Sequence, residues 1–490
     1  MEIISKGNFI NGKWRLGTGD KFCSYSPVNQ GLLWQGTFSK EEDINHAVTS
    51  AKEAFNIWSN LNIEKRIEYI KKYIDLVEKN KEALAQCISN EVGKPYWESL
   101  TEVNSVIGKL EPSIEAYNLR NKTIVRELND GSKSITKFRP HGVVGIIGPY
   151  NFPIHMVNGH VMAALLAGNT VIIKPSEKVP LTSEKVMELW EQAGLPNGVI
   201  NMVQGDKNAS EILCLNDDVK GIFFTGSKES GRNIEKLCLH KKICVLEMGG
   251  NSPYIVWDTS NIDSAVLTII NSSFVTSGQR CSTARRLVLP KNEFGDLFLK
   301  RLIEVSSKIK VGYPNDEQVF MGPLKTAYMV ENIIKKQAEL VSAGANSLLE
   351  SKKLPDLGPC FISPGIIDVT NVSKKIDEEI IGPFLQVIKV SSFEEAIGKA
   401  NDSCYGLAAG IITEDKTLYN EFVNKIEAGI ISLNKQLTGA SKYAPFGGIK
   451  ESGNYRPSGF LATDYCVYSI AITERERVSD IKNIPNGISL

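Results

Sequence analysis

The strongest constraint on the fold is an alternation of short apolar runs with amphipathic segments over residues 142–250. The apolar runs include VVGIIG, TVIIKP, GIFFTGS and ICVLEMGG, and segments with helical spacing, such as MVNGHVMAALLAG and SEKVMELWEQAG, separate them. Buried strands linked by helices, with glycine and proline at the junctions, are typical of βαβ units. Residues 254–440 repeat the alternation less regularly. We therefore predict an α/β fold with two open, mostly parallel-sheet domains.

Two other segments have patterns of their own. Residues 41–120 carry apolar side chains at three- and four-residue spacing, which predicts amphipathic helices that cover a sheet. The polar, alternating stretch IVRELNDGSKSITKFRPHG follows, and its Asp130-Gly131 pair is typical of a two-residue hairpin turn. We expect this stretch to form a protruding β-ribbon. A chain of 490 residues also exceeds the roughly 250–300 at which one hydrophobic core stops growing, so two or three domains are expected.

Composition excludes several classes of protein. The chain has 56 Lys and Arg against 56 Asp and Glu, which argues against a nucleic-acid-binding protein. It contains no run of about 18 apolar residues and no signal-peptide pattern, so we expect no membrane association and a cytoplasmic location. Nine cysteines without metal-ligand spacing indicate free thiols, with neither a disulfide framework nor a bound metal.

The ends of the predicted strands carry polar residues that suit a nucleotide. In VIIKPSE, Lys174, Ser176 and Glu177 follow a strand, and a lysine with an acid can bind the hydroxyls of a ribose. The acid would repel a 2′-phosphate, which favours NAD over NADP. The same residues would also suit an ordinary solvated loop.

A second strand end starts a helix with small residues. In GIFFTGSKESG, Gly226, Ser227, Ser230 and Gly231 lie where a strand turns into a helix. Free amides of the first helical turn and a hydroxyl can bind a phosphate, although the same pattern is also that of a simple helix cap.

Three residues suggest covalent chemistry. Cys281 lies in a polar Gly-Gln-Arg loop, where Arg280 and backbone amides could stabilise a thiolate, whereas several other cysteines have apolar neighbours. Glu247 ends a strand before two glycines and could act as a base if it is buried, and Asn151 could donate to an oxyanion. Each of the three could also have only a structural role. For Glu247, the alternative is a strand-end side chain that points to water.

Together these residues resemble the aldehyde dehydrogenase superfamily over nearly the whole chain. The matching elements occur in the family's order: GPYNFP, AGNTVIIKPSE, FTGS, LEMGGN, GQRC, EEIIGP, NDSCYGLAAGI and PFGGIKESG. The resemblance implies a thiol that attacks an aldehyde, hydride transfer to NAD, and hydrolysis of the resulting thioester. In those roles Cys281 would be the nucleophile, Asn151 with the Cys281 amide would hold the oxyanion, and Glu247 would activate water.

The resemblance also assigns the cofactor site and the domains. Lys174 and Glu177, with Ser176 between them, match positions at the adenosine ribose, and Glu379 matches the nicotinamide ribose. One departure is Ile381, where many members carry phenylalanine. The remaining cofactor positions form the pyrophosphate turn, which comprises Gly226, Ser227, Lys228, Glu229, Ser230 and Gly231. The implied regions are an NAD-binding domain (1–124 and 145–252), an oligomerisation ribbon (125–144 and 465–490) and a catalytic domain (253–464), in a homo-oligomer that is at least a dimer.

Within the superfamily the chain is most similar to the enzymes that oxidise N-succinylglutamate 5-semialdehyde in arginine degradation by the succinyltransferase route. The marks of this similarity include FVTSGQRCSTARR and NKQLTGASKYAPFGGIKESGNYRPS. Such a substrate has two carboxylates, for which Arg456 ranks first and Lys435 second among the cations expected at the mouth. Other cations considered for this role are Lys442, Arg285 and Arg286.

Three alternatives stay open. The substrate could be another small acidic aldehyde, such as succinate or glutamate semialdehyde, with either NAD or NADP. The thioester could be passed to coenzyme A, although the presence of Glu247 favours water. A catalytically silent binding protein is the third alternative, and the presence of Cys281, Glu247 and Asn151 together argues against it.

Overall fold

The alternating segment forms a seven-stranded sheet in the computed structural model, which describes residues 3–373, 377–478 and 484–489. Five neighbouring strands of this sheet are parallel to one another, in the order β12 (Ile243–Met248), β11 (Val219–Gly226), β8 (Val143–Ile147), β9 (Thr170–Lys174) and β10 (Ile200–Met202). Beyond β10 the sheet continues antiparallel, with β2 (Asn8–Ile10) and β3 (Lys13–Arg15). The amino-terminal strands were not expected from the sequence.

Helices cover both faces of this first sheet, because its strands bury side chains on both sides. In β8, Val144 and Ile146 belong to one apolar core, while Val143 and Ile147 belong to the other. The core around Val143 is closed by α1 (Glu41–Ser59), α8 (Lys207–Leu215) and α9 (Lys228–Cys238). The opposite core is closed by α2 (Ile63–Lys79), α3 (Lys81–Val92), α4 (Tyr96–Ile107), α5 (Leu110–Arg120), α6 (His155–Ala167) and α7 (Pro180–Ala193). The helices predicted over residues 41–120 are thus confirmed as α1 to α5.

The second alternating segment forms another seven-stranded sheet. Its order is β15 (Asn346–Leu349), β16 (Gly365–Asp368), β17 (Phe384–Val390), β14 (Ala284–Pro290), β13 (Ser252–Val256), β19 (Ala408–Ile412) and β20 (Ile430–Leu433). Only the β15–β16 pair is antiparallel in this sheet. Its helices are α10 (Ile262–Ser273), α11 (Glu293–Ser306), α12 (Ala327–Ser342), α13 (Phe393–Asn401) and α14 (Lys416–Lys425). The predicted α/β fold with two mostly parallel sheets is confirmed.

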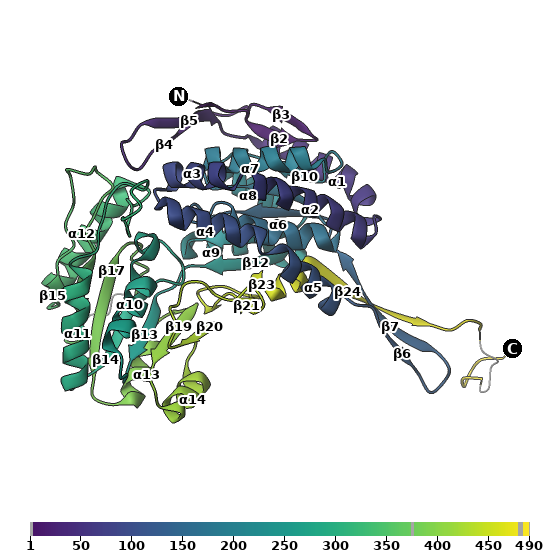
Figure 1. Cartoon of the computed structure of the whole chain (residues 1–490). Helices are drawn as coiled ribbons and strands as arrows, with labels where there is room; N and C mark the ends of the chain where they lie inside the picture. The colour runs from purple at the N-terminus through teal and green to yellow at the C-terminus, as the bar shows by residue number, and fades with distance from the viewer. Residues whose placement is uncertain (1–2, 374–376, 479–483, 490) are drawn as a thin grey trace.

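A three-stranded antiparallel ribbon reaches out from the body of the molecule (Figure 1). It consists of β24 (Val467–Glu474), β7 (Lys133–Pro140) and β6 (Ile124–Glu127). The hairpin turn at Asp130-Gly131 is longer than the predicted two residues, because the Leu128 amide donates to the Ser132 carbonyl at 2.8 Å and closes a wider loop. Residues 479–483 and 490 of the expected ribbon segment lie outside the described residues. The domain boundaries and the role of the ribbon stay predictions.

The remaining strands are short. A three-stranded sheet near the amino terminus contains β1 (Ile3–Ile4), β5 (Leu32–Thr37) and β4 (Lys21–Tyr25), and two further pairs join β18 (Tyr405–Gly406) to β22 (Ile449–Lys450) and β21 (Pro445–Phe446) to β23 (Ser458–Gly459). The segment that holds the last strands returns to the first sheet, where the Asn454 side chain accepts a hydrogen bond of 2.8 Å from the Leu246 amide. The segment between β22 and β23 therefore packs against the end of β12.

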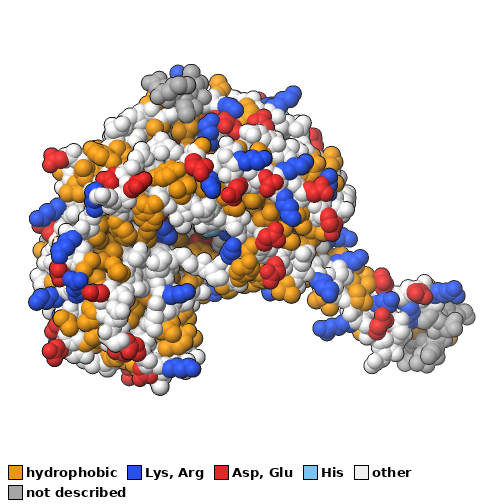
Figure 2. Space-filling model, in the orientation of Figure 1, with side chains coloured by type: hydrophobic (Ala, Val, Ile, Leu, Met, Phe, Trp, Pro, Cys, Tyr) orange, Lys and Arg blue, Asp and Glu red, His pale blue; other side chains and the backbone are white. Residues whose placement is uncertain are grey.

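Acidic and basic side chains intermingle on the face of the molecule in Figure 2, in line with their equal numbers. Among the described residues, no helix combines the length and the apolar character that a membrane crossing requires.

Candidate active site

A cavity of about 970 Å³ lies where the carboxyl ends of β8, β9, β11 and β12 meet loops of the second sheet. Ten of the residues predicted from the sequence line it: Asn151, Lys174, Ser176, Glu177, Gly226, Ser227, Ser230, Glu247, Cys281 and Glu379. Five others do not line it: Lys228, Glu229, Gly231, Lys435 and Arg456. The structure therefore brings the thiol, the buried acid, the amide and most of the expected nucleotide-binding residues to one place.

Cys281 lies in a tight loop before β14 that the surrounding fold holds in shape. Thr276 and Ser277 both have positive φ angles, 58° and 52°, and Gly278 follows at 69°. Residues with side chains adopt this conformation only where contacts enforce it. Here the Glu98 carboxylate accepts hydrogen bonds from the amide of Thr276, at 3.1 Å, and from its hydroxyl. Glu98 of α4, in the first half of the chain, thus shapes the loop that carries the thiol.

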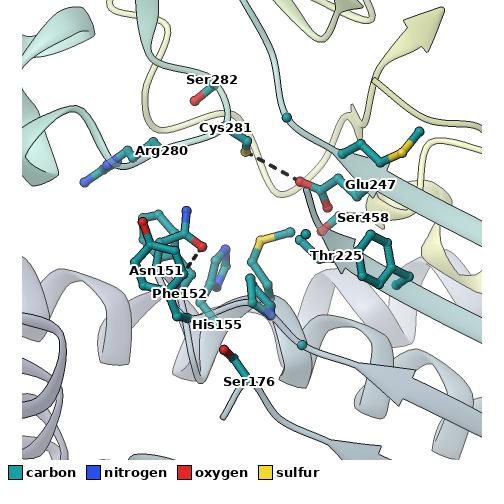
Figure 3. Close-up of a pocket in the computed structure, with 18 of the residues that line it drawn as sticks. Asn151, Phe152, His155, Ser176, Thr225, Glu247, Arg280, Cys281, Ser282 and Ser458 are labelled. Atoms are coloured by element: carbon teal, nitrogen blue, oxygen red, sulfur yellow. Dashed lines mark hydrogen bonds between the residues drawn. The ribbon is translucent and has the colours of Figure 1, made fainter. Parts of the chain in front are cut away.

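Arg280 does not stabilise a thiolate, so that expectation is wrong. Its guanidinium donates to Glu98 at 2.8 Å and to the Thr276 hydroxyl at 2.6 Å, and it points away from Cys281 in Figure 3. Burial, followed by the nearby acids Glu247 and Glu379, raises the pKa of Cys281 well above its usual range, although a backbone hydrogen bond opposes this. Cys281 therefore rests as a thiol and needs a base to become a nucleophile.

Glu247 is placed to act as that base. It lies in β12, is 0% exposed, and its Oε1 is 3.7 Å from the Cys281 sulfur, which donates to it (Figure 3). Its other carboxyl oxygen is buried and accepts no hydrogen bond from the described residues. Burial raises the pKa of Glu247 to about 8. The side chain faces the cavity instead of bulk water, and it can exchange a proton near neutral pH.

Asn151 follows β8 and is held by the loop that carries the thiol. Its amide nitrogen donates to the Gln279 carbonyl at 2.7 Å, and its oxygen accepts the Phe152 amide at 3.1 Å. An amide group has two N–H bonds, so one remains for an oxygen atom in the cavity. This arrangement suits a donor to a developing oxyanion close to Cys281.

At the far end of the cavity, Lys174 and Glu177 follow β9 as expected. The Lys174 ammonium donates to the carbonyls of Gly205 and Asp206 at 2.8 and 3.3 Å, and it lies 3.9 Å from the Glu177 carboxylate. Ser176 lies between them on the same wall. The lysine is thus fixed by backbone carbonyls, whereas 42% of the Glu177 side chain is exposed and can reach a ligand.

The helix start after β11 forms another wall of the cavity. Ser227 caps α9, because its hydroxyl accepts the Ser230 amide at 3.2 Å, and both serines are exposed. Gly231 packs against the sheet, where an added Cβ would lie 2.3 Å from the Met248 sulfur. The open first turn of a helix with small residues is a suitable site for an anion. Lys228 turns away from the cavity, over the ring of Tyr405 at 4.6 Å.

Arg285 braces the two loops that meet between the thiol and the helix start. Its guanidinium forms an ion pair with Glu379 at 3.2 Å and donates to the carbonyls of Gly250, Gly278 and Ile380 at 3.2, 3.2 and 2.6 Å. It is 1% exposed. Its donors are therefore used within the fold, so it is not the free cation for a substrate carboxylate that was considered from the sequence.

Comparison with known proteins places this geometry in a family. The model of the aldehyde dehydrogenase family matches residues 14–469. The chain belongs to the aldehyde dehydrogenase family. Similar solved structures include the aldehyde dehydrogenase KauB from Pseudomonas aeruginosa, at 31% identity and a TM-score of 0.91, with 96% of this chain and 97% of that chain covered.

Two further structures differ in the cofactor that their descriptions name. A betaine aldehyde dehydrogenase from Staphylococcus aureus in complex with NAD+ is 28% identical, with a TM-score of 0.93 and coverage of 99% and 97%. An NADP-dependent enzyme from E. coli is also 28% identical, with a TM-score of 0.91 and coverage of 96% and 98%. These proteins share the fold of this chain but do not determine its substrate.

The cations expected at the substrate mouth occupy different places in this aldehyde dehydrogenase. Arg456 donates to the Gly448 carbonyl at 2.5 Å, and Lys435 is exposed outside the cavity. Arg286 is buried and donates to the backbone carbonyls of Asn251 and Ala400. Lys442 does line the cavity, and its ammonium donates to the Gly108 carbonyl at 2.7 Å.

Two residues of the aldehyde dehydrogenase site were missed from the sequence. Glu98 shapes the thiol loop, and Lys109 lines the cavity although it is only 5% exposed. Neither lies at the end of a predicted strand, which is where the sequence indicates ligand-binding residues. A lysine between two apolar helical stretches, as in SVIGKLEPSI, is the one signal that pointed to a buried charge. Among the described residues, no group of His, Cys, Asp or Glu forms a metal site.

Proposed function

We propose that this aldehyde dehydrogenase oxidises N-succinylglutamate 5-semialdehyde to N-succinylglutamate with NAD, in arginine degradation by the succinyltransferase route. The observation that carries the chemical part is the contact between the Cys281 thiol and the buried Glu247 carboxyl, in a cavity that also reaches the start of α9. The substrate part rests on the sequence marks around the thiol loop and the mouth.

The first step forms a thiohemiacetal. Glu247 takes the proton of the Cys281 thiol, and the sulfur attacks the aldehyde carbon. The carbonyl oxygen becomes an oxyanion, which the free N–H of Asn151 and the Cys281 backbone amide stabilise. Because the thiol has a raised pKa, deprotonation is linked to attack, and little thiolate accumulates beforehand.

The residues at the other end of the cavity fit a dinucleotide. The exposed first turn of α9, with Gly226, Ser227 and Ser230, suits the pyrophosphate, and the Lys174–Glu177 pair suits a ribose. When bound, NAD accepts the hydride that leaves the substrate carbon as the thioester forms. Glu379, held by Arg285, lies between this region and the thiol, which suits the second ribose. Glu177 would repel a 2′-phosphate, which supports NAD over NADP.

The last step hydrolyses the thioester. Glu247 first releases the proton that it took from the thiol to solvent. It then takes a proton from a water molecule, whose oxygen attacks the thioester carbon. The C–S bond breaks, the acid product leaves, and the thiol regains its proton. A buried carboxyl with a pKa of about 8 suits this step, because it can both take up and release a proton near neutral pH.

The substrate carboxylates need cations. Lys442 is an exposed cation of the cavity wall, and it lies within the segment NKQLTGASKYAPFGGIKESGNYRPS on which the substrate proposal rests. It replaces Arg456 and Lys435 in our proposal for this role, because these two do not line the cavity. Its present hydrogen bond to a backbone carbonyl is easily exchanged for a carboxylate.

We also propose a homo-oligomer formed through the ribbon. Strand β6 is exposed along its whole length, and it presents Ile124 and Val125 at 48% and 53% exposure. Apolar side chains on a projecting strand favour pairing with another copy. Light scattering on the purified chain tests the oligomer. The cytoplasmic location expected from the sequence stays a prediction.

The substrate proposal is tested by initial rates of NADH formation on N-succinylglutamate 5-semialdehyde, glutamate semialdehyde and succinate semialdehyde. We expect the succinylated substrate to exceed the others in kcat/KM by about tenfold or more, which is at least ~1.4 kcal/mol of transition-state discrimination. Equal values for the three would contradict the substrate but leave the aldehyde chemistry intact. Replacing NAD by NADP in the same assay tests the cofactor.

A further inference from the structure

A buried lysine lies in the cavity that holds the acid we assign as the base. Lys109 immediately precedes α5 and lines the same cavity as Cys281 and Glu247. Its ammonium donates to the Ser458 hydroxyl at 3.2 Å. It lies against α6 at Gly159, where an added Cβ would be only 2.4 Å from the ammonium nitrogen. A glycine at this position leaves the space that the lysine occupies.

The Lys109 ammonium is left without a carboxylate partner. In the described part of the chain it forms no ion pair, whereas the other buried lysine near this wall, Lys94, is paired with Glu102 at 2.5 Å. Glu247 also lacks a partner for one of its oxygens, because its Oε2 is buried and accepts no hydrogen bond from the described residues. A buried charge without a partner is costly, so each group is held at the cavity by the rest of the fold.

Electrostatics couples these two groups. Burial lowers the pKa of Lys109 to about 8, and the charge of Glu247 opposes that shift. In the other direction, burial raises the pKa of Glu247, and Lys109 is the largest influence that lowers it. The Cys281 thiol also lowers the pKa of Glu247, through its hydrogen bond.

Among the other titratable groups near this pair, Lys94 and Arg280 are paired with the carboxylates of Glu102 and Glu98, and three further groups carry no charge near neutral pH. Burial lowers the pKa of His160 to about 3 and that of His155 well below its usual range, so both imidazoles are neutral. Burial raises the pKa of the Tyr465 phenol well above its usual range, so it stays protonated. Lys109 is thus the positive charge that acts on Glu247 at this end of the cavity.

We propose that Lys109 is a positioning residue that favours the charged form of the buried Glu247 carboxyl, the form that takes a proton from the water that hydrolyses the Cys281 thioester. The inference rests on the proposed function, since it gives Glu247 the role of base. The lysine donates no proton to the substrate. It acts through the carboxylate, and the Ser458 hydroxyl holds the ammonium in place.

The test uses p-nitrophenyl acetate, which needs neither NAD nor the natural aldehyde. Glu247 takes the proton of the Cys281 thiol and later releases it to solvent. The sulfur attacks the ester carbon, the C–O bond breaks, and p-nitrophenolate leaves as an acetyl thioester forms. Water then attacks the thioester, Glu247 takes its proton, the C–S bond breaks, and acetate leaves. A burst of p-nitrophenolate reports the first step, and the steady rate reports hydrolysis.

The variant is Lys109→Met, which keeps the length and removes the charge. We expect the burst amplitude to remain. The acid limb, which is the fall of the steady rate as the pH is lowered, should shift to higher pH by about one unit or more. The reason is that loss of a nearby opposite charge raises a carboxyl pKa. Lys109→Arg should restore the limb at least in part. Ser458→Ala, which removes the partner of the ammonium, should shift the limb in the same direction by less.

The control is Lys207→Met, which removes another cation of the same cavity, one without a proposed role in catalysis or binding, and should leave the acid limb in place. An unchanged limb in Lys109→Met with an intact burst would overturn the inference, as would an effect on KM alone, which would make Lys109 a substrate-binding cation. If Lys109→Met does not fold, a limb that stays in place in both Lys109→Arg and Ser458→Ala overturns the inference. Release of p-nitrophenolate by Cys281→Ala at the rate of the unaltered protein would instead contradict the proposed role of Cys281.

Discussion

The two ends of the cavity are built in opposite ways. At the thiol end, Cys281 and Glu247 come from segments of different sheets, and burial shifts the pKa of both groups upwards. At the other end, one strand-turn-helix unit from Gly226 to Gly231 presents exposed small residues and helix amides. The first end depends on exclusion of water and long-range contacts. The second depends on local backbone geometry.

The two ends of the cavity should therefore respond differently to substitution. A substitution at the thiol end should change the rate of a chemical step, because the groups there act on reacting bonds. A substitution at the helix end should change the affinity for the cofactor and leave the chemistry intact once the cofactor is bound.

The largest effect is expected for Cys281→Ala. Without the sulfur no thiohemiacetal can form, so NADH production should fall to background. The Kd for NAD, measured by calorimetry, should stay as in the unaltered protein, because the first turn of α9 is untouched. Appreciable turnover by this variant would contradict the assignment of the nucleophile.

The next effect is expected for Glu247→Gln. The amide keeps the shape of the side chain but cannot take a proton, so the steady rate should fall by about 10²–10⁴-fold. Any thioester that forms should persist, which stopped-flow absorbance would show as a burst of NADH followed by a slow phase.

The matched control is Glu177→Gln, which neutralises a carboxylate at the opposite end of the cavity. It should raise the KM for NAD and leave the steady rate at saturation nearly unchanged. A normal steady rate in Glu247→Gln would mean that another group is the base.

The pH profile of the unaltered enzyme provides a third test. Glu247 accepts a proton only when it is ionised, and burial raises its pKa to about 8. The steady rate should therefore increase as the pH rises through about 8 and fall below it, while the Kd for NAD changes little over that range. A flat profile between pH 6 and pH 9 would contradict the buried carboxyl as base.

The helix end of the cavity could be predicted from the sequence to a large extent, and the reason is its locality. The buried strand GIFFTG, the serine cap and the following helix are neighbours in the chain. Their local sequence pattern therefore predicts the strand-turn-helix geometry. The same holds for Lys174 at the end of β9. The amino-terminal strands β2 and β3 were missed because they have three residues each, too few to show a periodicity.

The thiol end could be predicted only in its reactive residues, and only because they match a family pattern. Neighbouring residues suggested that Arg280 stabilises a thiolate, but a carboxylate 182 positions away, Glu98, binds its guanidinium. Arg285 was a candidate substrate cation until the structure showed it bracing two loops. Lys109 lies at the cavity through the packing of α5 on α6, which no local pattern describes.

The smallest effect is expected for Ser227→Ala, at the helix end. Loss of the cap removes the acceptor for the Ser230 amide and should cost about 1 kcal/mol of stability. The first turn of α9 then holds its amides less firmly, so the Kd for NAD should rise by about threefold to tenfold, or ~0.7 to 1.4 kcal/mol. Isothermal titration and thermal unfolding measure the two quantities.

The matched control for this variant is Ser392→Ala. Ser392 caps α13, a helix that packs on the second sheet, and its hydroxyl accepts a hydrogen bond from the Glu395 amide at 3.1 Å. It does not line the cavity. Both variants should lower the melting temperature by a similar amount, since each removes one cap of the same kind. Only Ser227→Ala should weaken NAD binding, and neither should change the burst seen with p-nitrophenyl acetate. An equal loss of NAD affinity in the two variants would mean that global stability, and not the start of α9, sets cofactor affinity, which would remove the separation between the two ends of the cavity.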